Sequence, residues 1–158
     1  MKDRLDYAQA APAGYKALFS VHSYVHGCGL EKELIDLVYL RISQINGCAY
    51  CLDSHSRDLL KQGTSLEKLV LLQAWHEALP LFSVRERAAL AWAESVTQVA
   101  QTQVPDADYA AAAAVFNDKE MADLTLAISL MNALNRVGVS FRKVPAGVKA
   151  HLENGGDE

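Results

Sequence analysis

The chain has 158 residues, of which 51% are hydrophobic and 22% are charged. This length and balance suit one globular domain with a hydrophobic core of its own. The net charge of −4, with no cluster of basic residues, argues against a surface that binds nucleic acid or anionic membranes. We therefore expect a small molecule or another protein as the partner.

The N-terminus has no apolar run of signal-peptide length, and no segment reaches the roughly 18 apolar residues that a membrane-spanning helix needs. We predict a cytoplasmic protein. Three cysteines are an odd number. In a reducing compartment a CxxC pair is more often redox-active or metal-binding than a structural crosslink. Cys48 and Cys51 form such a pair, and we interpret the remaining Cys28 as structural.

Two helices are predicted in the first third of the chain. Apolar residues recur at helical spacing over residues 15–25, and Gly27 and Gly29 end that helix. The second helix covers residues 31–45, with acidic residues in its first turn, where the helix dipole favours them. Asn46-Gly47 is a typical stop signal, so the chain turns there.

Further helix signals follow at short intervals. A third helix is predicted from Cys48 to about Lys61 and ends at Gly63. Thr64-Ser65-Leu66-Glu67 and Ser83-Val84-Arg85-Glu86 both have the form of a capping box. They predict helices over about 66–77 and 84–101, separated by a turn at Pro80.

The last third also indicates helices. Pro105 and the alanine run 110–114 favour one helix, and Asn117-Asp118-Lys119-Glu120 caps a long one over about 119–139. That long helix is apolar over most of its circumference, so we expect it to be central or buried by a neighbouring subunit. The short polar tail after Pro145 should be poorly ordered unless it docks. No alternating strand pattern occurs, which predicts an all-α fold.

The segment from Asn46 to His55 concentrates the reactive side chains. On a helix that starts near Cys48, the residues Cys48, Cys51 and His55 stand at i, i+3 and i+7 and share one stripe. A helix N-terminus lowers the pKa of a cysteine below about 8.5, because unpaired backbone N–H groups stabilise the thiolate. An oxidised Cys51, such as a sulfenic acid, could be resolved by Cys48, with His55 moving the proton.

Other uses of a CxxC pair remain possible. The pair could be half of a zinc site or two core thiols, but a closed zinc site usually combines two such knuckles. His22, His26 or Cys28 could supply one further ligand, yet the sequence has no second knuckle. We therefore predict neither a metal nor a cofactor. The histidine pair is better explained by a helix-surface or interface role.

The segment from Asp36 to Cys51, together with His55, resembles the core of the AhpD-like alkylhydroperoxidase branch of the carboxymuconolactone decarboxylase family. The resemblance spans about residues 15–142 of a single domain at 1–158, and its specific part is CxxC-x3-H. It continues through Ala74-Trp75-His76-Glu77, through 82–90, through 124–128, and to Asn132 and Asn135-Arg136.

This resemblance implies an all-helical, oligomeric protein, a trimer, dimer or hexamer, that reduces hydroperoxides. It implies that Cys51 attacks the peroxide and that Cys48 resolves the product. A dithiol protein or a small thiol would then reduce the disulfide. The decarboxylase activity is the weaker option, because that branch lacks the paired cysteines.

The family also places a glutamate on the preceding helix, which relays protons with the histidine. Asp36 stands at the matching position and is one methylene shorter, and Glu33 is the competing carboxylate. Tyr50 replaces the usual histidine and could form a wall of the substrate pocket. We interpret Asn135, like the residues Trp75, His76 and Trp92, as a core or interface group.

The sequence thus favours a thiol-dependent peroxidase with Cys51, Cys48, His55 and Asp36 as its site. One alternative is a dithiol oxidoreductase that acts on disulfides of partner proteins without peroxide specificity. The other is a non-catalytic or zinc-binding helical assembly protein.

Overall fold

A computed structural model describes residues 1–154, and within that range the chain contains helices and no strand. The predicted all-α fold is therefore confirmed. The elements in chain order are α1 (Tyr7–Ala10), α2 (Pro12–Gly27), α3 (Lys32–Asn46), α4 (Ala49–Lys61), α5 (Leu66–Leu71), the 3-10 helices η1 (Leu72–Glu77) and η2 (Leu79–Leu81), α6 (Val84–Thr97), α7 (Val99–Thr102), α8 (Asp106–Ala113), α9 (Asp118–Ser140) and α10 (Ala146–Glu153).

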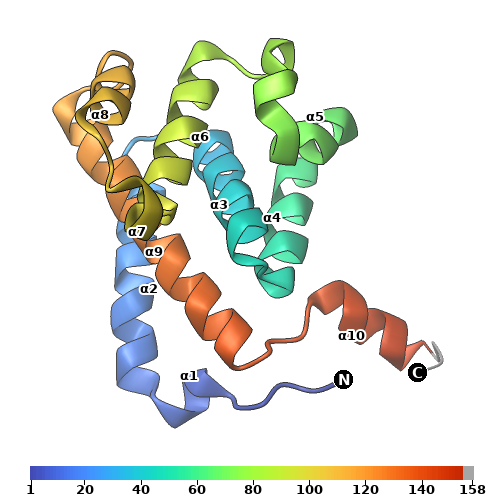
Figure 1. The fold of residues 1–158 in the computed structure, drawn as a ribbon. Helices are drawn as coiled ribbons and strands as arrows, with labels where there is room; N and C mark the ends of the chain where they lie inside the picture. Colours follow the sequence, from blue (N-terminus) through green and yellow to red (C-terminus); the bar gives the residue numbers. More distant parts are fainter. Residues whose placement is uncertain (155–158) are drawn as a thin grey trace.

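Helix α3 has the central place in the bundle (Figure 1). Its contacts with α4, α6 and α9 are the most extensive between elements of the described chain. The sequence favours a central position for the helix at 119–139, but that helix, α9, packs beside α3 and leaves Leu126 45% exposed. Burial of this face by another subunit stays a prediction.

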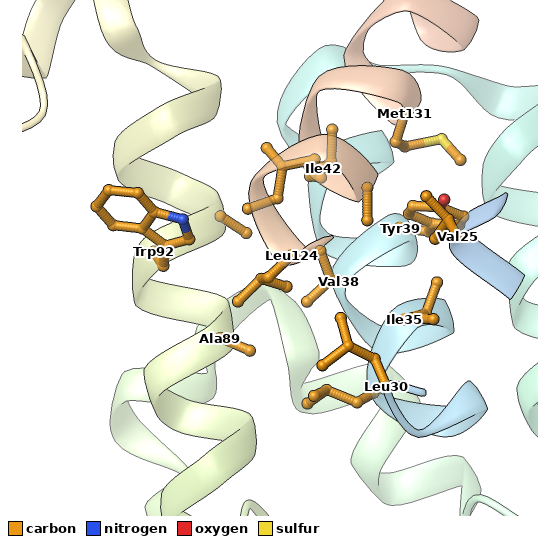
Figure 2. Packing of buried hydrophobic residues seen from close by; sticks show 14 of the residues in the cluster. Val25, Leu30, Ile35, Val38, Tyr39, Ile42, Ala89, Trp92, Leu124 and Met131 are labelled. Atoms are coloured by element: carbon orange, nitrogen blue, oxygen red, sulfur yellow. The ribbon is translucent and has the colours of Figure 1, made fainter. Parts of the chain in front are cut away.

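Two hydrophobic clusters lie on either side of α3. The larger one joins α3 to α2, α6 and α9, and Figure 2 shows Trp92 and Ala89 facing Leu124 and Val38 within it. Both cysteines of the CxxC pair belong to this cluster. The smaller cluster packs α3 against α4, α5, η1 and α6 through residues such as Leu59 and Leu90. The site is therefore anchored on the best-packed part of the chain.

Most of the predicted helix signals act as expected. Gly47 ends α3 in the left-handed conformation, with φ of 65°, which glycine adopts without steric cost. The capping boxes at Ser83 and Asn117 are both formed, with Glu86 and Glu120 as the reciprocal partners. These caps fix where α6 and α9 begin.

The capping box predicted at Thr64 is wrong. Ser65 is the residue that caps α5, and its side chain accepts the backbone N–H of Lys68. The Thr64 hydroxyl instead donates to Glu33 at 2.9 Å, across to α3. A tertiary hydrogen bond thus takes the side chain that the local pattern assigns to a cap.

Two predicted helices are interrupted. The helix at 66–77 passes from α5 into a 3-10 segment with a kink at Ala74, where φ is −122° and ψ is 32°. The helix at 84–101 breaks at Gln98, which separates α6 from α7. Pro80 lies in η2, so the predicted turn there takes 3-10 form. At the N-terminus α2 begins at Pro12, three residues before the predicted start.

The tail after Pro145 forms α10, which docks against α4. The backbone N–H of Gly147 donates to Asp53 Oδ2 at 3.1 Å, and Asp53 Oδ1 accepts from Arg57 at 2.8 Å. The sequence predicts an ordered tail only if the tail docks, and it docks as far as residue 154. The remaining residues of the tail lie outside the part of the chain that the structure describes. In the described range, no helix has the length and hydrophobicity to cross a bilayer.

We expect Asp53→Ala to loosen α10, because the substitution removes the acceptor for the Gly147 N–H. One partly exposed, charge-assisted hydrogen bond contributes about 1 kcal/mol, or roughly a fivefold change in local opening. Amide hydrogen exchange over residues 146–153 should accelerate by that factor. Asp58→Ala is the control, because Asp58 pairs with Lys61 on the surface. Equal acceleration in both variants would contradict this anchoring role.

Candidate active site

The turn between α3 and α4 places the two cysteines at the start of α4. Cys48 is the N-cap of that helix, and its backbone N–H donates to Ser43 O at 3.0 Å. Cys51 lies in the first turn, where backbone N–H groups have no partner within the helix. The predicted position of the pair at a helix N-terminus is therefore present.

Both sulfur atoms pack against the same glycine of α9. A Cβ atom at Gly138 would lie 3.2 Å from Cys48 Sγ and 4.0 Å from Cys51 Sγ. Any larger residue would push on the first sulfur, so glycine permits the close approach of α9. Both thiols are free and nearly inaccessible, with Cys48 1% and Cys51 6% exposed.

A buried amide lies against the sulfur pair. Asn135 is fully buried, and its Nδ2 donates to Ser43 Oγ at 3.1 Å. Its Oδ1 accepts from Asn46 Nδ2 at 3.0 Å, which fixes which way the amide points. The nearby Asn135 amide also acts to lower the pKa of both thiols. Asn135 is thus a core group, as the sequence suggests, and also a neighbour of the reactive atoms.

The two thiols share their protons unequally. A hydrogen bond from the Cys51 thiol, which outweighs the effect of burial, lowers the pKa of Cys48 to about 7. The backbone N–H groups of Cys51 and Tyr50 and the Asn135 amide act in the same direction. The hydrogen bond to Cys48, together with burial, raises the pKa of Cys51. The pair therefore releases one proton near neutral pH and retains the second.

His55 lies one turn beyond Cys51 and faces Asp36 of α3. The distance from His55 Nδ1 to Asp36 Oδ1 is 3.4 Å, which is an ion contact but too long for a close hydrogen bond. The His55 and Tyr39 rings meet edge-on, with ring centroids 5.2 Å apart. The buried Tyr39 hydroxyl has no hydrogen-bond partner among the described residues.

The Asp36 side chain is 4% exposed and is held from a second side. Its Oδ2 accepts from Gln62 Nε2 at 2.7 Å, and Lys32 Nζ lies 3.7 Å away. Burial alone would raise the pKa of Asp36, but His55, Gln62 and the Lys32 charge together lower it. The carboxylate is therefore ionised at neutral pH and oriented toward the imidazole.

Glu33, the competing carboxylate of the sequence analysis, points elsewhere. It accepts from Thr64, and its Oε1 lies 3.7 Å from Lys68 Nζ. The structure places Asp36, and not Glu33, in contact with His55.

The histidines of α2 pair with each other. His22 Nε2 and His26 Nε2 are 2.9 Å apart. Burial, together with the charges of His26 and His55, lowers the pKa of His22. Among residues 1–154, no cluster of three or more His, Cys, Asp and Glu side chains is positioned to hold a metal ion.

Two pockets flank the cysteine pair and share the wall formed by Tyr50, Gly138 and Lys143. The smaller pocket, about 150 Å³, is lined by Cys51, His55 and His22, and by Ser54 and aromatic side chains of α1 and α2. We call it the Cys51 pocket. The larger one, about 470 Å³, is lined by Cys48 and is called the Cys48 pocket. Tyr50 is thus a pocket wall.

The other aromatic candidates of the sequence analysis lie away from both pockets. Trp75 and Trp92 are buried core residues, whose indole N–H groups donate to Glu94 at 2.8 Å and Thr125 at 3.0 Å. His76 stacks on Trp75 at the surface and contacts the same Glu94.

Sequence reasoning overlooked Ser43, Gly138 and Lys143 as parts of the site. Gly138 carries a signal, because a glycine inside a long apolar helix indicates a packing reason for its presence. Ser43 and Lys143 carry none, since only the folded chain brings them to the cysteines.

Comparisons with known proteins place this geometry in context. Residues 12–95 match the model of the carboxymuconolactone decarboxylase family. The uncharacterised protein YdfG of Bacillus subtilis is 31% identical over 141 residues, which cover 89% of this chain and 95% of YdfG. The alkyl hydroperoxide reductase AhpD of Hyphomonas neptunium is 44% identical over 41 residues, covering 26% of this chain and 23% of that protein.

One solved structure is close over nearly the full length. It is a protein of unknown function from Agrobacterium tumefaciens, with a suggested AhpD antioxidant defence role. Its sequence identity is 39% and the TM-score is 0.88, over 91% of this chain and 98% of that one. The helical arrangement is therefore shared.

The pKa of the Cys48 thiol can be measured through its reactivity. In Cys28→Ser protein, alkylation of Cys48 by neutral iodoacetamide should rise with pH through a midpoint near 7, because the thiolate is the reactive form. Cys51→Ala removes the thiol donor, so the midpoint should move up toward the ordinary value of about 8.5. Mass spectrometry of the Cys48 peptide follows the reaction. A midpoint that stays near 7 would assign the effect to the backbone and to Asn135.

Proposed function

Because the chain belongs to the carboxymuconolactone decarboxylase family, we propose that it is an AhpD-like, thiol-dependent peroxidase that reduces hydroperoxides through its CxxC pair. The observation that carries this proposal is the arrangement of the two thiols. Cys48 and Cys51 share a proton at a helix N-terminus, and Cys51 faces a small pocket together with His55. The relative named alkyl hydroperoxide reductase supports the same class of reaction.

In the first step the Cys51 thiolate attacks one oxygen of the hydroperoxide. The thiolate forms when Cys51 passes its proton to Cys48, so the pair keeps its single negative charge. The O–O bond breaks, Cys51 becomes a sulfenic acid, and the departing alkoxide takes a proton from His55. The products are an alcohol, or water when the substrate is hydrogen peroxide.

In the second step Cys48 attacks the sulfenic sulfur. An S–S bond forms, and the hydroxyl group leaves as water with one proton. Both sulfurs lie beside Gly138 and the two thiols are hydrogen-bonded to each other, so no large rearrangement of the helices is needed. The two thiols have together given up two electrons, which reduce the O–O bond, and an external dithiol or two thiols must then reduce the disulfide.

Asp36 completes the relay in this proposal. Its carboxylate orients the His55 ring and stabilises the imidazolium form while the proton is in transit. The 3.4 Å contact shortens to a hydrogen bond when His55 carries its second proton. Asp36 thus acts through His55, and its shorter side chain still reaches the ring nitrogen.

Counting thiols tests the peroxidase directly. Reduced protein treated with cumene hydroperoxide should lose the thiols of Cys48 and Cys51 within minutes and keep Cys28. Cys51→Ser should abolish peroxide consumption, whereas Cys48→Ser should leave a sulfenic acid on Cys51 that dimedone traps. Cys28→Ser is the control and should behave as the unmodified chain. If Cys51→Ser still consumes peroxide and forms the adduct, the roles are reversed.

The outcome also separates the alternatives. If peroxide leaves the thiols intact while a protein disulfide oxidises them, the protein is a dithiol oxidoreductase. If purified protein holds stoichiometric zinc through dialysis, the redox proposal fails.

Asp36→Asn should slow peroxide turnover by about 10- to 100-fold, because an amide orients His55 poorly and does not stabilise the imidazolium. Glu33→Gln is the matched control and should change the rate less than twofold, since Glu33 contacts Thr64 and Lys68. Equal losses in the two variants would show that the relay does not run through Asp36.

A further inference from the structure

The Cys48 pocket is strongly cationic. Lys2, Arg142 and Lys143 line it, and no Asp or Glu is present among the described residues that do so. Within residues 1–154, none of the three cations forms an ion pair. Asp3, next to Lys2 in the chain, instead accepts the backbone N–H of Val144 at 2.7 Å. The pocket therefore presents positive charge beside a buried sulfur.

Two of these cations are fixed by the end of α9. Arg142 N–H donates to Val139 O at 3.1 Å and Lys143 N–H to Gly138 O at 2.9 Å, which is the Schellman arrangement. Arg142 occupies its left-handed position, with φ of 50°. Because glycine is the usual residue there, a side chain at this position has a conformational cost. The turn therefore places the Arg142 guanidinium at the Cys48 pocket in spite of this conformational cost.

Lys143 is held at the wall between the two pockets. Its Nζ donates to the Tyr7 hydroxyl at 3.2 Å and lies 4.6 Å from the centre of the Tyr50 ring. Burial alone would lower the pKa of Lys143, but Tyr7 and Tyr50 raise it on balance, so the ammonium stays charged. The Tyr7 hydroxyl and the face of the Tyr50 ring therefore hold the Lys143 ammonium without neutralising its charge.

The remaining lining of the Cys48 pocket is largely apolar, with Met1, Val139 and Pro145 among its residues. The Cys51 pocket differs, because it is about a third of that volume and contains His55. The two sulfurs thus face chemically different openings, although they lie beside the same glycine.

We propose that the Cys48 pocket is the entrance for the reductant and that it selects a thiol carrying a negative charge. The inference rests on the proposed function in that it starts from the Cys48–Cys51 disulfide. The reductant thiolate attacks Cys48 Sγ and forms a mixed disulfide, and Cys51 leaves as a thiolate that takes a proton from His55. A second thiol, from the same or another molecule, then attacks the mixed disulfide. Two thiols are oxidised to one disulfide, and the CxxC pair is reduced.

The direction of attack follows from the two openings. In thiol–disulfide exchange the incoming, central and leaving sulfurs are in line, so a nucleophile from the Cys48 pocket expels Cys51 toward its own pocket. Exchange proceeds through the thiolate, whose charge the lining cations attract. The hydrogen bond that lowers the pKa of Cys48 needs the Cys51 thiol, so it does not exist in the disulfide and does not favour Cys48 as the leaving group.

Three small thiols of similar size test the charge selection. Full-length protein is oxidised with diamide, and its disulfide is reduced by 2-mercaptoethanesulfonate, 2-mercaptoethanol or cysteamine, which are anionic, neutral and cationic. The variant Lys2→Gln/Arg142→Asn neutralises two cations that line only the Cys48 pocket, and asparagine tolerates the left-handed position. Lys61→Gln is the control, because Lys61 lies on the exposed end of α4.

All three thiols react as thiolates, so each rate is compared with that of 2-mercaptoethanol, whose thiolate carries one charge. At low salt, the double variant should lower this relative rate by about tenfold for the sulfonate thiol, whose thiolate carries a second negative charge. This corresponds to roughly threefold for each unit charge about 6 Å away in water. The rate with 2-mercaptoethanol should itself fall by up to about tenfold, because its thiolate loses the same attraction. An unchanged circular dichroism spectrum shows that the variant is folded. Cysteamine, whose thiolate is a net-neutral zwitterion, should gain relative to 2-mercaptoethanol. The difference should fade at 0.5 M salt, and Lys61→Gln should match the unmodified protein.

Single-cysteine proteins locate the effect. Cys48 alone should react with the anionic disulfide 5,5′-dithiobis(2-nitrobenzoate) about tenfold more slowly in the double variant, because the same cations attract the carboxylates of this reagent. Cys51 alone should not respond, and neutral dithiodipyridine should react equally in all proteins. Cys28→Ser is present throughout.

Each other outcome has a definite meaning. Failure of diamide to form the disulfide would refute the proposed function itself. A disulfide whose reduction shows no charge preference, or equal losses with all three thiols, would refute only the reductant entrance. If the double variant slows oxidation by the hydroperoxide of a fatty acid and leaves reduction unchanged, the pocket serves an anionic oxidant instead.

Discussion

The close packing of α9 against the turn between α3 and α4 is the constraint on which the site depends. Gly47 lets the chain turn directly from α3 into α4, so that Cys48 is the N-cap of α4. Gly138 lets α9 pack closely over both sulfurs. With a larger residue at Gly138, Cys48 Sγ would have to move. The proximity of the thiols is thus set by two positions without side chains.

That packing also determines the electrostatics of the pair. A buried thiolate is costly unless hydrogen bonds replace the lost water. Here the replacements are the Cys51 thiol, backbone N–H groups of α4 and the Asn135 amide. These groups stabilise one negative charge on the cysteine pair, whereas burial and the first charge oppose a second. The pKa values of the Cys48 and Cys51 thiols therefore move in opposite directions. Near-complete burial further restricts which oxidants reach the sulfurs.

The sequence predicts those parts of the structure that depend on local signals. Gly47, Ser83 and Asn117 mark helix ends correctly because their effects involve neighbouring residues only. The prediction fails at Thr64, whose hydroxyl finds a partner on α3, and it leaves the state of α10 open, because that helix forms where Asp53 binds it. In both places a tertiary contact replaces the local pattern.

The same distinction applies to the candidate site. The spacing of Cys48, Cys51 and His55 indicates a dithiol beside a base, and the family resemblance adds Asp36. The contact between Asp36 and His55, and the choice of Asp36 over Glu33, required the packing of α3 against α4. Asn135 and Lys143 are more than 80 residues from the cysteines in the chain, and no local pattern connects them. Helix α9 supplies both the amide behind the sulfurs and, at its end, the cations in front of Cys48. A shift of this one helix would therefore alter the acidity of the thiols and their access to charged molecules together.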